Sequence, residues 1–150
     1  MSPLAIVLMV AGILVGVAAI NLAVWLPIVR KLHRLPDLLR EELAGEKITV
    51  GPERAQYRGA TQTYGRVKGL GVAALTDRRL AFRKALGKPV DVPVDQIVGV
   101  REDRVFLRSV SSRRHVIIKL SDGTEVGYYF ASPEQWLGAL RLIAEERAAG

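Results

Sequence analysis

One uninterrupted apolar segment constrains this chain more than any other feature. From Leu4 to Val29, 22 of 26 residues are apolar and none is charged, whereas all 37 charged residues lie from Arg30 onward. As a helix the segment would be roughly 39 Å long, which exceeds a hydrocarbon core of about 30 Å. The 121 residues that follow are too few to bury such a helix on every face. The sequence therefore predicts a single transmembrane anchor over residues 1–29.

A cleaved signal peptide is the alternative interpretation of this segment. Ala18 and Ala19 resemble a small-residue cleavage site. A signal peptide, however, usually begins with positive charge and has an apolar region of about 7–15 residues. Here no charged side chain precedes the apolar region, which is also longer, so an uncleaved anchor is favoured.

The flanks of the segment predict its orientation. Arg30, Lys31 and Arg34 follow it directly, and no basic side chain precedes it. Because positive loops stay on the cytoplasmic side, we expect a cytoplasmic C-terminal domain at the cell membrane, with the N-terminus outside. These three cations are part of the formal net charge of +7, and without them residues 35–150 carry only +4, from 19 basic and 15 acidic residues.

Gly12 and Gly16 are spaced so that two helix backbones could approach closely on that face. Pairing of two copies is one hypothesis for this spacing. Small residues are frequent in membrane spans, so an ordinary lipid-facing position is the other.

The segment after the anchor, residues 30–44, is expected to be a basic juxtamembrane connector with a short helix. Pro36 follows the basic stretch, and residues 37–44 favour a separate helix that starts with Asp37 and ends before Gly45.

From about Lys47 onward the apolar pattern has a period of two, which indicates half-buried strands. Ser121–Gly123 is typical of a hairpin turn, and Thr76–Asp77 indicates another. The connections leave no room for crossover helices, so we expect a mainly antiparallel sheet. The clearest alternation lies in residues 79–83, 90–95, 116–120 and 125–130.

One amphipathic helix is predicted at the end of the chain, over residues 133–147. Ser132 suits its N-cap and Pro133 its first position, while Trp136, Leu137 and Leu140 share one apolar face. About seven strands and this helix predict a small split barrel, residues 45–150, with the helix closing one open end.

The hairpin at residues 69–82, GLGVAALTDRRLAF, resembles the signature hairpin of bacterial pleckstrin-homology-like (PH-like) and GRAM-like domains. The GEK at residues 45–47, the VPVDQI at residues 92–97, Phe130 and Trp136 extend the similarity over roughly residues 45–147. The resemblance implies a bacterial inner-membrane protein with a PH-like barrel. These residues are structural, so they speak for the fold and not for a ligand.

The sequence predicts no enzyme and no metal or cofactor site. The two histidines, His33 and His115, have no neighbouring ligand set, and the chain has no cysteine. Gly69, Gly71 and Ala74 match the spacing of a dinucleotide fingerprint, but a turn and a strand follow them instead of a helix. The glycines are better explained as the crowded start of a strand.

Basic residues around the loops are the candidate binding feature. A domain held beside an anionic leaflet gains about 1 kcal/mol for each well-placed cation. The candidate lipid contacts are Arg58, Arg66, Lys68, Arg83, Lys84 and Lys88. In eukaryotic phosphoinositide-binding relatives of this fold, cations at the first hairpins grip head groups, but residues 66–68 do not match that full signature. The competing interpretation is that these cations are ordinary solvated strand ends.

We therefore expect a membrane-anchored, non-catalytic binding or scaffold module that contacts anionic lipid. The alternative is a protein–protein interaction subunit of a membrane complex without specific lipid binding. A nucleic-acid partner is not expected, because no recognised motif or base-reading helix is present.

Overall fold

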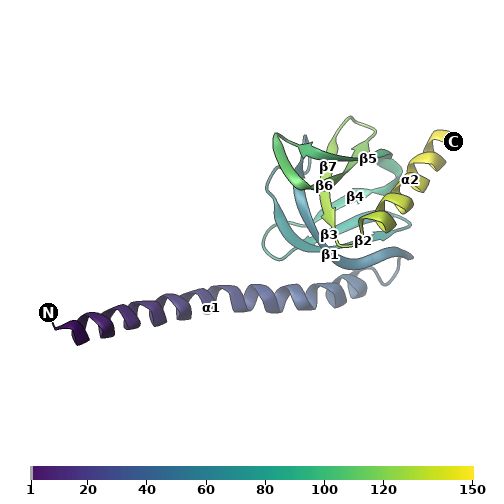
Figure 1. Cartoon of the computed structure of the whole chain (residues 1–150). Helices are drawn as coiled ribbons and strands as arrows, with labels where there is room; N and C mark the ends of the chain where they lie inside the picture. The colour runs from purple at the N-terminus through teal and green to yellow at the C-terminus, as the bar shows by residue number, and fades with distance from the viewer. Residues whose placement is uncertain (1) are drawn as a thin grey trace.

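The computed structural model describes residues 2–150, which form one long helix followed by a curled β-sheet and a second helix (Figure 1). The expected layout of an apolar N-terminal helix, seven antiparallel strands and a closing helix is confirmed. The elements in chain order are α1 (Pro3–Glu42), β1 (Ile48–Ala60), β2 (Gly69–Thr76), β3 (Arg79–Lys84), β4 (Val90–Pro93), the 3-10 turn η1 (Val94–Gln96), β5 (Ile97–Phe106), β6 (Ser109–Leu120), β7 (Glu125–Phe130) and α2 (Pro133–Ala149).

The strands form a single antiparallel sheet in the order β4-β3-β2-β1-β7-β6-β5. The two edge strands, β4 and β5, are joined by η1 alone, so the sheet curls into a half-barrel. The expected turn at residues 121–123 is confirmed, and Asp122 Oδ1 accepts a hydrogen bond from the Thr124 amide at 2.8 Å. Alternate side chains of each strand point into the curl, as the period of two predicts.

The main core lies inside the curl, and α2 closes it. Trp136, Leu137 and Leu140 are buried there, and the Trp136 indole stacks on Phe130 with ring centroids 4.1 Å apart. The indole Nε1 donates to the Glu53 carboxylate. Helix α2 begins at Pro133 as predicted, but the Ser132 hydroxyl makes no capping bond. The Ser132 amide instead donates to Glu53 Oε1 at 3.0 Å, which ties the helix start to β1.

Helix α1 does not stop at Pro36, contrary to the expected separate helix over residues 37–44. It continues through Pro27 and Pro36 to Glu42 as one 40-residue helix. A proline inside a helix costs about 3 kcal/mol because it removes a backbone hydrogen bond. Burial of one leucine contributes about 1.5–3 kcal/mol, and three leucines beyond Val29 are buried on the sheet. This packing offsets the proline and keeps the helix intact.

The three leucines, Leu35, Leu39 and Leu43, recur every four residues and so lie on one face of the helix end. They pack on the outer face of β2 and β3, against Val72, Ala74, Ala81 and Ala85. Strand β2 is therefore buried on both faces. The N-terminal part of α1 extends away from the domain; it is long and apolar enough to cross a membrane, and its apolar stretch has no buried residue (Figure 1).

Candidate functional site

Ion pairs lock the end of α1 onto the sheet. The Arg83 Nε donates to Glu42 Oε2 at 2.9 Å, and its Nη1 donates to Asp91 Oδ1 at 2.8 Å. The hydrogen bond from Arg83 lowers the pKa of the Glu42 carboxyl, and the same bond raises the pKa of Arg83. Because β3 and β4 supply Arg83 and Asp91, the helix cannot slide along the sheet without breaking this chain of contacts.

A second set of contacts holds the residue that leads into β1. The Arg79 Nη2 donates to Glu46 Oε2 at 2.8 Å, and the Thr76 hydroxyl donates to Glu46 Oε1 at 2.9 Å. The Arg79 bond is the main cause of the lowered pKa of Glu46. Both ends of the connection between α1 and β1 are thus fixed.

The docked helix places the β3–β4 loop beside the first residues after the apolar segment. A shallow pocket of about 290 Å³ between them is lined by Lys31 and Leu35 of α1 and by Gly87 and Pro89 of the loop. Leu86 at the tip is 66% exposed. The loop whose Gly87 and Pro89 line the pocket with Lys31 therefore also presents an uncovered apolar side chain.

The six candidate lipid contacts fall into different environments. Arg83 is paired as described, and Lys84 lies over the Tyr57 ring at 4.6 Å and donates to the Val67 carbonyl at 3.0 Å. Burial lowers the pKa of Lys84. The structure brings Arg58 and Lys68 together at the Ser109 hydroxyl, with donor–acceptor distances of 3.3 and 3.5 Å. The remaining two, Arg66 and Lys88, are exposed on the β1–β2 and β3–β4 loops.

The residues predicted to orient or pair the helix lie on its exposed surface. Arg30, Lys31 and Arg34 are exposed and line a shallow depression with Pro27 and Leu38. A Cβ added at Gly12 or Gly16 would meet nothing within 4 Å. The dinucleotide spacing falls in β2, as the strand interpretation predicts, and a Cβ at Gly71 would lie 2.0 Å from the Arg83 carbonyl oxygen.

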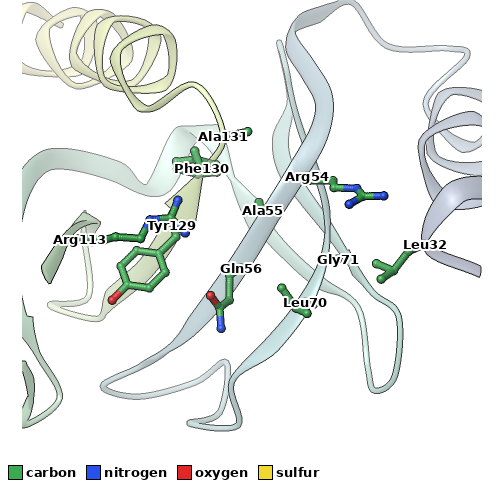
Figure 2. A pocket seen from close by; sticks show the side chains of 10 residues that line it. All are labelled: Leu32, Arg54, Ala55, Gln56, Leu70, Gly71, Arg113, Tyr129, Phe130 and Ala131. Atoms are coloured by element: carbon green, nitrogen blue, oxygen red, sulfur yellow. The ribbon is translucent and has the colours of Figure 1, made fainter. Parts of the chain in front are cut away.

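The sequence did not predict a groove between α1 and the outer face of β1, β2, β6 and β7 (Figure 2). It encloses about 260 Å³. Its longer side chains include two arginines, an amide, two aromatic rings and two leucines: Arg54, Arg113, Gln56, Tyr129, Phe130, Leu32 and Leu70. Strand periodicity could have indicated part of it, because Arg54, Gln56 and Arg58 alternate along β1.

The groove is positive. Within residues 2–150, Arg54, Arg58 and Arg113 form no salt bridge, unlike Arg79 and Arg83. The guanidinium carbons of Arg58 and Arg113 lie 4.6 and 4.8 Å from the centre of the Tyr129 ring. No acidic residue lines the groove.

A buried histidine, His115, packs against the Tyr129 ring. The His115 ring centroid lies 4.7 Å from that of Tyr129, and its Nδ1 lies 3.2 Å from the Asp103 carbonyl oxygen. Burial is the main cause that lowers the His115 pKa, and the charges of Arg58 and Lys68 act in the same direction. The positive charge here therefore comes from the arginines and not from the imidazole. Among the residues described, no group of three or more His, Asp or Glu side chains could hold a metal ion.

Comparison with known proteins gives a structural likeness only. No protein-family model matches the chain, and no curated protein does. A similar solved structure is the C-terminal domain of an unknown protein from Leishmania infantum. It aligns with a TM-score of 0.50 and 16% sequence identity, covering 72% of this chain and 95% of that one. At this identity the likeness concerns the fold alone.

Proposed function

We propose that this chain is a single-pass membrane protein whose PH-like domain is held on the cytoplasmic face and contacts anionic lipid head groups. The observation that carries the proposal is the docking of α1 on β2 and β3, which fixes the β3–β4 loop beside Lys31. A rigidly held loop at that place meets the membrane surface whenever α1 spans the bilayer.

The length of α1 supports this arrangement. A 40-residue helix is about 60 Å long, of which a hydrocarbon core takes about 30 Å. The part beyond Val29 remains for the domain, and it is there that Leu35, Leu39 and Leu43 are buried.

The position of Lys31 along the helix axis supports contact of the adjoining loop with lipid head groups. Lys31 lies two residues after Val29, or about 3 Å along the axis, whereas each head-group layer is about 5–7 Å deep. Exposed Leu86 and Lys88 share the adjoining loop, and the β1–β2 loop with Arg66 and Lys68 is tied to it by Lys84. Apolar tips between cations suit the boundary between acyl chains and anionic head groups.

The PH-like part of the proposal is supported by the single curled sheet of seven antiparallel strands and by the closing helix α2. The Trp136 and Phe130 side chains that contributed to the resemblance stack on each other in the core. The cytoplasmic orientation is supported by exposed Arg30, Lys31 and Arg34 at the end of the apolar segment.

A second candidate is a protein–protein interaction subunit. Strand β5 is a ten-residue edge of the sheet, and Val98 and Val105 on it are 41% and 47% exposed. An edge of this kind can accept a strand from another protein.

Depth-dependent quenching tests the proposed membrane contact. The chain has no cysteine, so Leu86→Cys introduces one labelling site for an environment-sensitive fluorophore. In lipid nanodiscs that contain phosphatidylglycerol and lipids spin-labelled at the head group, we expect strong quenching at position 86.

The control label is Glu145→Cys, in the part of α2 that lies away from the N-terminal end of α1 (Figure 1). We expect little quenching there. Equal quenching at the two positions would contradict the proposed contact of the β3–β4 loop with the membrane.

A further inference from the structure

We propose that the groove between α1 and the outer face of the sheet binds the phosphate of one anionic phospholipid head group. This inference rests on the proposed function, because it requires α1 to stand in the membrane. It assigns the specific lipid contact to groove residues that do not belong to the β3–β4 loop, and so it makes a separate claim.

The depth of the groove matches the position of lipid phosphates. Leu32 forms one wall and lies three residues after Val29, or about 4.5 Å along the helix axis. That distance falls inside a head-group layer about 5–7 Å deep. The groove is therefore at the level at which phosphates lie when residues up to Val29 occupy the hydrocarbon core.

The size of the groove suits a head group and not a whole lipid. Its 260 Å³ is just below the range of about 300–1,000 Å³ that is usual for small-molecule pockets. Leu32 and Leu70 form apolar walls at the side of the groove that faces α1. These walls suit contact with the glycerol end of the lipid.

The charge of the groove selects an anion. Arg54 and Arg113 lie on different sides of Gln56 (Figure 2), and neither has a carboxylate partner among the residues described. Guanidinium groups bind phosphate oxygens through paired hydrogen bonds, and the Gln56 amide adds donors. Arg83, which holds α1, is paired with carboxylates, whereas Arg54 and Arg113 keep their donors available for a phosphate.

Tyr129 makes this site rigid. Its side chain is buried, and its ring lies under the guanidinium groups of both Arg58 and Arg113. A guanidinium stacked on an aromatic ring loses little further freedom when it binds an anion. Arg113 is thereby positioned before the lipid arrives, while Arg58 adds positive charge at the same ring.

Native mass spectrometry of the full chain in detergent tests the proposal. With phosphatidylglycerol added, we expect one tightly bound lipid per chain. The double variant Arg54→Gln with Arg113→Gln should bind it about a hundredfold more weakly, because each of the two lost charged hydrogen bonds accounts for about a factor of ten. Gln56→Trp keeps both arginines but fills the groove, and it should weaken binding as well.

The matched control removes two exposed cations elsewhere, Arg141→Gln with Arg147→Gln on α2, and should bind within about twofold of the parent chain. The melting temperature of each variant in the same detergent checks its fold. Unchanged affinity in both groove variants, or an equal loss in the control, would overturn the proposal. Binding of a glutamate-rich peptide instead of lipid would overturn it too.

The outcomes separate the two proposals. If position 86 is quenched but the groove variants keep full lipid affinity, the groove proposal is refuted and the proposed membrane contact of the loop stands. If position 86 is not quenched, both proposals are refuted.

Discussion

Arginine side chains have two different roles in this molecule. Arg79 and Arg83 each contact two carboxylates and are largely withdrawn from solvent. Arg54 and Arg113 face a groove and have no carboxylate partner within residues 2–150. Arg83 holds the end of α1 in place through Glu42, and Arg79 fixes Glu46 in the connection to β1, because in each case the partners lie on separate parts of the chain. In the proposed lipid complex, the second pair would supply its hydrogen-bond donors to the phosphate.

The pairing of Glu42 with Arg83 gives a pH dependence with a definite sign. The hydrogen bond holds the folded-state pKa of Glu42 below its ordinary value of 4.5. Its contribution to stability is therefore present above pH 4.5 and is lost as the pH falls through the lower folded-state pKa, where the unfolded chain binds more protons. Because Glu42 is about half exposed, we expect less than about 1 kcal/mol from it.

Carbon-13 NMR titration of the Glu42 carboxyl in the full chain measures this effect. We expect a pKa below 4.5 in the parent chain and a return toward 4.5 in Arg83→Gln. Arg101→Gln, which removes a cation paired with Asp103 and Glu125, is the control and should leave the Glu42 titration unchanged. A Glu42 pKa that does not respond to Arg83→Gln would refute the pairing.

At the scale of elements, α1 is one helix with two different surroundings. Its apolar N-terminal part is unburied within residues 2–150, and its last turns are packed on β2 and β3. Strand β2 is buried on both faces for this reason, with Ala73 and Leu75 in the barrel core and Val72 and Ala74 under the helix. The last turns of the helix and the domain are therefore packed together instead of being joined by a loose linker.

Docking of α1 predicts that two adjacent leucines contribute very differently to the free energy of unfolding. Leu39 is fully buried on the sheet, whereas Leu38 is 53% exposed. Leu39→Ala should lower the free energy of unfolding by about 2–5 kcal/mol, because it leaves a cavity in the interface. Leu38→Ala should change it by about 0.5 kcal/mol or less.

Denaturant unfolding of both variants in detergent, followed by near-ultraviolet circular dichroism of the buried aromatic residues, gives the comparison. A similar loss in the two variants would mean that the helix face is assigned wrongly.

At the scale of the whole molecule, the proposed topology predicts the location of the C-terminus. A reporter that works only in the cytoplasm should be active when it is fused after Gly150. A reporter that works only outside the cytoplasm should be inactive at the same position. Replacing Arg30, Lys31 and Arg34 together by Gln should reduce this bias, because cations near the end of a span dominate its orientation.

The matched control replaces Arg104, Arg141 and Arg147 by Gln and should leave the orientation unchanged, since these positions are remote from the span along the chain. Activity of an exported-only reporter on the parent chain would reverse the proposed topology.

Some of the fold could be predicted because the responsible interactions are local. Hydrophobic alternation placed the strands, and Asp122 with its neighbours placed a hairpin turn. Pro133 marked the first residue of α2, since its fixed backbone angle suits that position. The helix break predicted at Pro36 was wrong because local signals do not include distant packing. The packing that keeps the helix intact past Pro36 comes from strands about 40 residues further along the chain.

The sequence by itself determined that the chain has one long apolar helix, that antiparallel strands follow it and that a helix closes the curled sheet. Each of these depends on patterns that neighbouring residues create together, namely the run without charge, the period of two and the turn residues. Tertiary structure alone decided that α1 is clamped to β2 and β3, that Arg83 is paired and that Arg54 and Arg113 share a groove with Leu32. Those contacts join residues far apart in the chain, and they depend on the curl and register of the sheet, which no local pattern encodes.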